Sequence, residues 1–315
     1  MLTAFSIRDG RLAQVQVDAP EELSRDALWI DLIDPTEEER RWVEATYDQP
    51  LPRPAELEEI EASARFYEDD EGLHIHSYFL HEVDERPRNV SVAFTLNDGR
   101  LFTLHEHELL SFRLFRMRAR RQPSLAREAV SVLLGLFEAK VERLADVLEA
   151  VYADLERISQ WVLDRSGADM ETVMSQLASQ EDVNGKARLS LMDKQRAISF
   201  LLRSGVLKEP QAQASREILR DIESLTAHTS FLFEKVNFLM DAALGFINLE
   251  QNQIIKIFSI AAVVFLPPTL IASMYGMNFQ YMPELHAPWG YPLSIVLMIA
   301  SGIAPYWFFK RKGWL

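Results

Sequence analysis

The longest apolar stretch of the chain runs from Ile254 to Tyr275, and Lys256 near its start is its one charged residue. An apolar segment of about 20 residues is long enough to cross a bilayer as an α-helix, because a helix rises about 1.5 Å per residue. The stretch therefore predicts a membrane-spanning helix over residues 254–275. Pro267 and Pro268 lie inside it, and we expect them to kink or loosen the helix because they remove backbone donors.

The polar residues of this predicted helix fall on one side of it. With Asn252 placed at position a of a heptad, Ser259, Leu266 and Ser273 also occupy a, and Ile255, Ala262, Thr269 and Gly276 occupy d. Small and hydroxyl residues let membrane helices pack closely, so one interpretation is a helix–helix contact. The other is a water-filled pore, formed when several copies turn the same stripe inward. Taken alone, the stripe favours the helix contact.

A second apolar segment, Tyr291–Phe309, is followed by Lys310, Arg311 and Lys312, whereas the connection 276–290 contains no Lys or Arg. The excess of positive charge on cytoplasmic segments places the basic tail in the cytoplasm and the connection outside. The first residues lack the charged and apolar regions of a signal peptide. We therefore expect both termini in the cytoplasm.

The amino-acid composition excludes several classes of function. Lys and Arg total 33 and Asp and Glu total 47, which gives a net charge of −14. This balance argues against a nucleic-acid partner and suits cations. The chain has no cysteine, which excludes disulfides, thiolate metal sites and cysteine nucleophiles. It also lacks a glycine-rich phosphate loop, a nucleophile elbow and an HExxH motif, so we do not expect an enzyme.

The first part of the chain reads as α/β. Alternating or apolar runs predict strands at Leu2–Ile7, Leu12–Val17, Ala27–Ile33, Leu73–Leu80, Val90–Leu96 and Arg100–Leu104. Thr36 with Glu39 three residues later predicts a helix N-terminus, and Pro54–Glu61 reads as an acidic helix. His74 and His76 share one strand face, but no third metal ligand is evident. We interpret them, and likewise His105 and His107, as ordinary histidines.

The next part has the periodicity of long helices. Apolar residues recur at three- and four-residue steps over Val130–Leu163, Met170–Leu202 and from Ala214 onward, with breaks at Arg165–Ala168 and Gly205–Pro210. The first two helices are expected to form a hairpin. The third continues without a breaker to Tyr275, about 62 residues or roughly 93 Å. Such a length predicts a stalk that transmits movement from a cytoplasmic sensor to the membrane.

These patterns predict an α+β cytoplasmic domain with a long helical stalk, followed by two transmembrane helices. The expected boundaries are 1–110 for the α/β domain, 111–253 for the stalk and regulatory region, 254–275 and 291–309 for the two membrane helices, 276–290 for the outer loop and 310–315 for the basic tail.

The residues after the first membrane helix carry a resemblance to a known family. Tyr275-Gly276-Met277-Asn278 is followed by Met282-Pro283-Glu284-Leu285. Over essentially its whole length the chain resembles the CorA family of magnesium channels, whose signature is Gly-Met-Asn at this place. The resemblance implies a funnel-shaped homopentamer in the bacterial inner membrane that admits Mg²⁺, with Co²⁺ and Ni²⁺ as further passengers. A related transporter of Zn²⁺ or another transition metal, and a non-conducting coiled-coil sensor or scaffold, remain the alternatives.

The resemblance also assigns pore roles. It places Gly276, Met277 and Asn278 at the outer mouth as the selectivity ring, Thr269 and Asn252 further down the pore, and Ile255 and Leu266 at hydrophobic constrictions. Ser259 and Ser273 share the face by the heptad count, and Glu284 is expected to concentrate cations near the mouth. Neutral oxygens suit this cargo because Mg²⁺ gives up its water shell reluctantly.

Acidic residues of the soluble part are the candidate regulatory ligands. Glu217 and Asp221 lie four residues apart on the predicted stalk, and the sequence by itself favours an ion-pair network with Arg216 and Arg220. The resemblance instead implies Mg²⁺ sites between subunits that hold the channel shut. The family pattern falls on Pro54, Leu57, Glu58, Glu59 and Ile60, and the stalk acid falls on Glu217. The glutamates are longer than the aspartates of some relatives.

Overall fold

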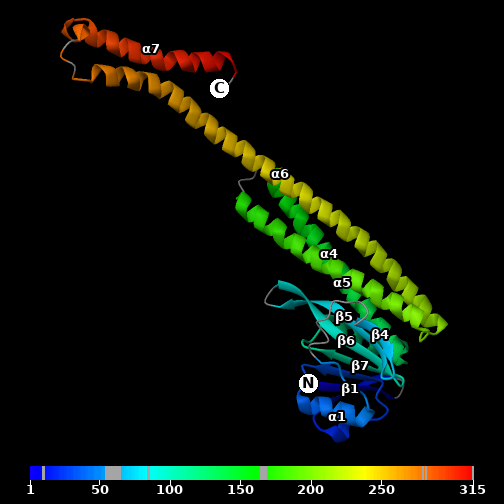
Figure 1. Cartoon of the computed structure of the whole chain (residues 1–315). Coiled ribbons are helices and arrows are strands. Elements are labelled where there is room, and N and C mark those ends of the chain that lie inside the picture. The colour runs from blue at the N-terminus through cyan, green and yellow to red at the C-terminus, as the bar shows by residue number, and fades with distance from the viewer. Residues whose placement is uncertain are drawn as a thin grey trace. The chain divides into compact units, whose positions relative to one another are not determined.

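The computed structural model describes residues 1–8, 11–53, 65–83, 86–163, 169–278, 280 and 282–313. The chain forms two compact units, Met1–Met240 and Asp241–Leu315. The helix α6 (Glu209–Tyr275) contributes residues to both of them. Figure 1 shows the sheet and the helices α4, α5 and α6 of the first unit, and the end of α6 with α7 in the second.

The first unit is built on a seven-stranded sheet with the order β2-β1-β3-β7-β6-β5-β4. Its strands are β1 (Leu2–Arg8), β2 (Arg11–Val17), β3 (Trp29–Ile33), β4 (Phe66–Asp69), β5 (Gly72–Val83), β6 (Arg86–Asn97) and β7 (Arg100–His105). Only β3 and β7 run parallel; the other neighbouring pairs are antiparallel. Each predicted strand is present. The acidic strand β4 was not predicted, because Glu68 and Asp69 give it no apolar alternation.

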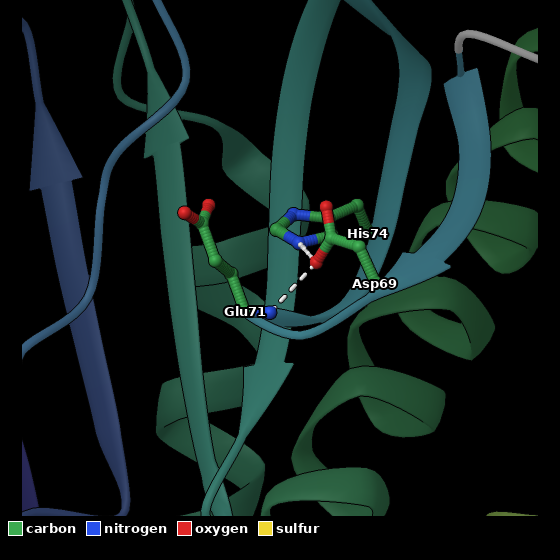
Figure 2. Close-up of side chains that lie close together, drawn as sticks. All are labelled: Asp69, Glu71 and His74. Atoms are coloured by element: carbon green, nitrogen blue, oxygen red, sulfur yellow. Dashed lines mark hydrogen bonds and ion pairs between the residues drawn. The ribbon is translucent and has the colours of Figure 1, made fainter.

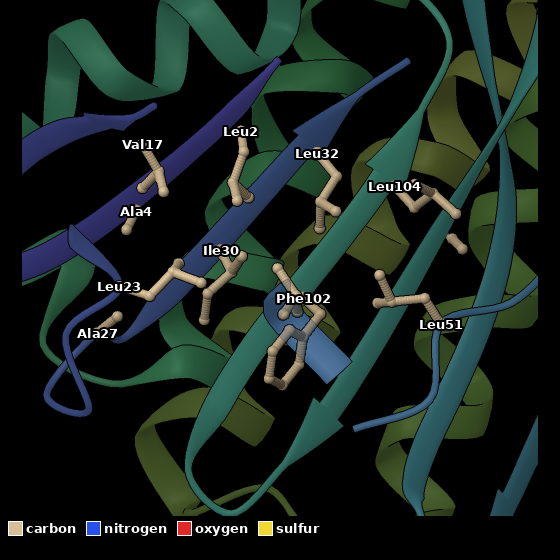
Figure 3. Close-up of a cluster of buried hydrophobic side chains, with 12 residues drawn as sticks. Leu2, Ala4, Val17, Leu23, Ala27, Ile30, Leu32, Leu51, Phe102 and Leu104 are labelled. Carbon is tan, nitrogen blue, oxygen red and sulfur yellow. The ribbon is translucent and has the colours of Figure 1, made fainter. Parts of the chain in front are cut away.

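Both faces of this sheet are buried, because alternate residues of each strand point to opposite sides. Ile30 and Leu32 belong to a core cluster (Figure 3) that includes Val43 of α1 (Glu37–Tyr47). Trp29 lies on the other face, where its ring centroid is 6.0 Å from that of Phe112 in α3 (Leu110–Arg121). The sheet therefore lies between α1 and the helices that follow it.

Helix α1 begins as the sequence predicts. The Glu39 backbone N–H donates to the Thr36 hydroxyl at 3.2 Å, and the Glu39 carboxylate accepts from the Thr36 backbone N–H at 2.8 Å. The reciprocal pair satisfies two N–H groups that lack helical partners.

Three long helices follow, as expected. They are α4 (Ala129–Leu163), α5 (Met170–Ser204) and α6. Gly205, with φ of 76°, ends α5 in the left-handed conformation that favours glycine. The predicted break through Pro210 is too long, because α6 already begins at Glu209 and Pro210 lies in its first turn, where its missing N–H costs nothing. The Asn184 side-chain amide donates to the Thr229 carbonyl at 3.0 Å and ties α5 to α6.

Buried charges join β5 to α5. The Asp193 carboxylate accepts from the Ser77 hydroxyl at 2.5 Å and from the Tyr78 backbone N–H at 2.8 Å, and it lies 2.7 Å from the Arg65 guanidinium. The Lys194 ammonium donates to the Ser77 hydroxyl at 2.8 Å. Burial lowers the pKa of Lys194 to about 8, although the Asp193 charge opposes the change. These contacts fix α5 on the sheet.

The second unit contains the end of α6, the 3₁₀ turn η4 (Pro283–His286) and α7 (Gly290–Arg311). Helices α6 and α7 are each long and apolar enough to cross a membrane. They pack closely at Gly302, where an added Cβ would lie 3.4 Å from the Val264 carbonyl oxygen and 3.4 Å from Cγ of Pro268. Glycine at position 302 thus permits the contact of α7 with the Pro267–Pro268 segment.

Candidate functional site

The polar stripe of α6 lies on the face opposite α7. From Ile260 to Tyr275 the partly covered residues of α6 are Ile260, Ala261, Val264, Pro267, Pro268, Ile271 and Tyr275, and of these Val264 and Pro268 lie against Gly302 of α7. The stripe residues Ile255, Leu266, Thr269, Ser273 and Gly276 are exposed in the isolated protomer. Two residues along a helix are separated by about 200°, so Leu266 points away from Val264 and from α7. One protomer therefore leaves these five stripe residues uncovered.

Ser259 occupies the edge of this stripe. It lines a small cavity of about 320 Å³ together with Lys256, Ile260, Val263 and Phe309 of α7. Asn252 is exposed and continues the stripe toward the soluble part of α6. Ser259 is thus the stripe residue nearest to α7.

The C-terminal end of α6 presents backbone and amide groups. The Gly276 N–H donates to the Ala272 carbonyl at 2.9 Å, which closes the helix, and Met277 and Asn278 follow as exposed residues. About two turns before Gly276, the Thr269 hydroxyl donates to the Phe265 carbonyl at 2.7 Å. Its proton is used within the helix, so its oxygen lone pairs are oriented outward and can accept from water.

The connection between α6 and α7 is held by a tight contact. Glu284 lies in the first turn of η4, and its carbonyl oxygen would be only 2.0 Å from a Cβ at Gly290. Gly290 is therefore required where α7 begins, because any side chain would collide with the backbone of Glu284. Phe279 and Tyr281 lie outside the described residues.

The regulatory candidate Glu217 is exposed on α6. Its carboxylate accepts from the Gln213 side-chain amide at 2.9 Å. Arg216 pairs instead with Glu209 at 3.2 Å. In the part of the chain that the structure describes, neither Glu217 nor Asp221 forms an ion pair, so the ion-pair network that the sequence favoured is wrong there. The stalk carboxylates stay without a basic partner.

Two further acidic residues, Glu138 and Glu142 of α4, belong to the same group. Reduced hydration and then the Glu142 carboxylate raise the pKa of Glu138, and Asp221 and Glu217 add to the rise while Arg118 opposes it. Glu142 itself lies 2.5 Å from Arg118. We call Glu138, Glu142, Glu217 and Asp221 the stalk acid group. Sequence reasoning missed Glu138, because nothing in the α4 periodicity shows which stretch of α6 it faces.

The other regulatory candidates, Glu58 and Glu59, lie outside the described residues, as do Pro54, Leu57 and Ile60. The structure therefore does not test their place.

The histidines of the sheet have different surroundings. The His105 ring lies 2.9 Å from the Asp31 carboxylate and 2.7 Å from the His107 carbonyl, as expected of a structural histidine. His74 lies 3.0 Å from Asp69 and 3.2 Å from the Thr95 hydroxyl. The tight β4–β5 turn brings Glu71 to the same place, so that ligand atoms of Asp69, Glu71 and His74 all lie within 4.8 Å of one another (Figure 2). Both ring nitrogens of His74 are already engaged, which is typical of a structural His–carboxylate pair.

Comparison with known proteins agrees with this architecture. Residues 24–311 match the family model described as CorA-like Mg²⁺ transporter protein. The chain is 54% identical over 317 aligned residues to the magnesium transport protein CorA of Escherichia coli K12, and 53% identical to that of Yersinia pestis, with both chains fully covered in each case. The solved CorA magnesium transporter of Methanocaldococcus jannaschii superposes with a TM-score of 0.79 at 22% identity, over 100% of this chain and 99% of that one.

An α+β part, a long helix with an apolar end and a second apolar helix, together with these relatives, define a membrane transport protein for a divalent cation. The chain belongs to the CorA family of Mg²⁺ transporters.

Proposed function

We propose that the chain forms a homopentameric Mg²⁺ channel in which the stripe of α6 lines the pore and Mg²⁺ passes into the cytoplasm. The observation that carries this proposal is the position of α7. It packs on the face of α6 around Val264, opposite Leu266 and Thr269, so neighbouring protomers are free to meet around the stripe. One helix cannot enclose a path, and the number five follows from the resemblance to the family.

The chemistry of the stripe supports a hydrated cation as cargo. Asn252, Thr269 and Asn278 offer neutral oxygens, and the stripe contains no carboxylate. Neutral oxygens can accept from the water molecules around Mg²⁺, which prefers to retain several of them. Ile255 and Leu266 form apolar levels between these polar ones and serve as the constrictions. Co²⁺ and Ni²⁺, which hold similar water shells, are proposed as further passengers.

The orientation follows from charge. Lys310, Arg311 and Lys312 end the second membrane helix, whereas the connection 276–290 contains no Lys or Arg. We place both termini in the cytoplasm and Asn278 with Glu284 at the outer surface of the inner membrane. The membrane potential then drives entry, at about 2.3 kcal/mol per charge for every 100 mV.

Internal Mg²⁺ is proposed to close the channel by binding carboxylates of the soluble part. The stalk acid group supports this role, because four carboxylates gather there and Arg118 is paired with Glu142 of the group. Glu58 and Glu59 are proposed to complete such sites from an adjacent protomer. A ligand that binds only the closed state shifts the equilibrium toward it by its difference in affinity for the two states.

The decisive experiment measures Mg²⁺ uptake into liposomes that contain the purified protein, with internal Mg²⁺ either chelated or millimolar. Asn278→Ala tests the pore, and Gln280→Ala, which removes an exposed amide two residues further along the connection, is its control. Uptake that requires Asn278 and falls at high internal Mg²⁺ supports both the pore and the regulation. Flux of Zn²⁺ but not Mg²⁺ would favour the transition-metal alternative. If an intact oligomer conducts no divalent cation, the stripe is better explained as a contact between helices.

A further inference from the structure

A cavity of about 550 Å³ lies in the first unit, where the N-terminus of α3 meets α4, α5 and the strands β5 and β6. No stripe residue and no member of the stalk acid group lines it. Its volume is within the range of small-molecule sites, which hold roughly 300–1,000 Å³. The cavity is therefore large enough for a ligand that the transport function does not use.

The N-terminus of α3 opens into this cavity. Leu109, Leu110 and Ser111 line the wall, and Leu109 at the N-cap provides no side-chain acceptor. The first N–H groups of a helix have no partner within it, and the described residues supply none for Leu110, Ser111 or Phe112. Free N–H groups and the positive end of the helix dipole both favour an anion.

Ser111 adds an independent indication of a ligand. Its side chain is 3% exposed, yet its hydroxyl forms no hydrogen bond with any residue in the described ranges. The buried side-chain atoms without a partner in the described residues do not include its oxygen, so the hydroxyl keeps a small accessible area on the cavity side. Because Ser111 lines the cavity, a ligand there would supply that partner.

Lys140 of α4 contributes a buried positive charge to the same wall. Its side chain is almost fully buried, and its ammonium donates to the Leu80 carbonyl at 2.6 Å. An ammonium has three donors, and no carboxylate of the described residues pairs with this one. Burial, and then the charges of Lys194 and Arg143, lower the pKa of Lys140 well below its usual value. A bound anion would stabilise the charged form.

The wall also carries carboxylates, but each has a partner. Glu108 pairs with Arg116, Asp146 with Arg143 and Asp154 with Arg157. Arg113 lines the cavity and forms no ion pair within the described part of the chain. The cavity is lined by three acidic and three basic residues, and among the described residues Lys140 and Arg113 are the two lining cations without a carboxylate partner.

We propose that this cavity binds the phosphate group of a small molecule, with the first amides of α3, the Ser111 hydroxyl and the Lys140 ammonium as donors. Free inorganic phosphate and the phosphate of an organic molecule share this chemistry. The cavity is larger than a phosphate ion, and apolar residues such as Leu80, Val147 and Val183 line the remainder. An organic phosphate therefore fits the space better than the free ion.

The test is calorimetric titration of the full-length protein in detergent, without Mg²⁺, using inorganic phosphate and adenosine monophosphate as probes. We expect saturable binding, tighter for the nucleotide. Ser111→Ala should weaken it about 10-fold and Lys140→Met about 10- to 100-fold, as expected for lost hydrogen bonds to a charged group. Ser199→Ala and Lys208→Met remove the same groups outside the cavity and should leave affinity unchanged.

Each outcome has a consequence. Equal binding of both probes would assign the cavity to the free anion. Absence of saturable binding below about 10 mM, or undiminished binding in Ser111→Ala, would overturn the proposal; a Kd above that limit corresponds to a binding free energy of less than about 3 kcal/mol. Amine-labelling of the wild-type protein gives a second measurement, because bound phosphate should slow the acylation of Lys140 and not that of Lys208. If Lys140→Met fails to fold, the affinity of the Ser111→Ala variant and the amine labelling of the wild-type protein still show whether the cavity binds phosphate.

Discussion

The Arg65 guanidinium lies 2.7 Å from the Asp193 carboxylate, and the two side chains are only 5% and 2% exposed. Arg65 also donates to the His76 carbonyl at 2.8 Å, so this one side chain contacts both α5 and β5. A buried ion pair contributes little net stability, but removal of one partner leaves the other as an uncompensated buried charge.

We therefore predict that Asp193→Ala lowers the free energy of unfolding by about 3–5 kcal/mol. Asp182→Ala, which removes an exposed carboxylate that pairs with Lys186 on the same helix, should cost less than about 1 kcal/mol. Denaturant unfolding of the detergent-solubilised protein, followed by tryptophan fluorescence, measures both. Similar losses in the two variants would contradict the structural role of Asp193.

The stalk acid group predicts a second effect. Glu138→Gln removes like-charge repulsion and should stabilise the Mg²⁺-free protein by a few tenths of a kcal/mol. The same change should weaken the stabilisation that added Mg²⁺ gives. Thermal melting with and without Mg²⁺ measures this, with Glu149→Gln, an exposed acid on the same helix, as the control. A Glu138→Gln protein that responds to Mg²⁺ as the wild type does would separate Glu138 from the cation site.

The raised pKa of Glu138 also predicts a dependence on pH. A carboxyl group whose pKa is higher in the folded protein binds its proton more tightly there, so its contribution to stability falls as pH rises from the ordinary value near 4.5 through the raised one. Protons and Mg²⁺ compete for the same oxygens. Inhibition of uptake by internal Mg²⁺ should thus be weaker at mildly acidic than at neutral internal pH, and Glu138→Gln should reduce the difference. Liposome flux at fixed external pH measures it; inhibition that strengthens on acidification would contradict the assignment.

The apolar side chain of Leu266 allows a prediction about the constriction of the proposed pore. Leu266→Asn places a polar group at an apolar level of the stripe, where water would otherwise be excluded. We expect Mg²⁺ leakage at millimolar internal Mg²⁺, the condition in which the proposed regulation closes the wild-type channel. Leu266→Ile keeps the apolar level and is the matched control. No leak in the asparagine variant would place the constriction elsewhere.

The tight packing at Gly290 allows a prediction about the connection between α6 and α7. In Gly290→Ala the new Cβ would lie 2.0 Å from the Glu284 carbonyl oxygen, so either η4 or the start of α7 must move. We expect reduced uptake with little loss of stability in the soluble unit. Gly313→Ala, at a position where an added Cβ meets nothing within 4 Å, is the spatial control, although its φ of 69° adds some strain.

Much of this architecture was predictable because local signals agree with the final structure. Each of these signals is local to its own segment. They are the Thr36–Glu39 capping box, the glycine at position 205 and the helical periodicity that continues without interruption to Ile254. The stripe is also a local property, because one helix determines which residues share a face. The resemblance to the family then supplied the role of that face.

The remainder depends on contacts between distant segments. Glu138 and Glu217 are brought together by the packing of α4 against α6, and Asp69 meets His74 through the β4–β5 register. Likewise, Lys140 shares the apolar face of α4 with Leu136 and Leu144, but the helix pattern does not show that the Leu80 carbonyl of β5 accepts from its ammonium. The pattern of one segment does not show which distant residue it contacts in the fold. The partners of these residues could therefore not be predicted from the sequence.

The position of α7 behind α6 has a consequence for genetics. If each protomer gives the ion path a single helix, every stripe position becomes a ring of identical atoms, and one codon change alters the whole ring. A mixture of wild-type and Asn278→Ala subunits would then contain few pores with an unaltered ring, even when the variant is the minor species. Loss of transport should accordingly be dominant for changes on the stripe and recessive for changes on the face of α7 that points away from α6.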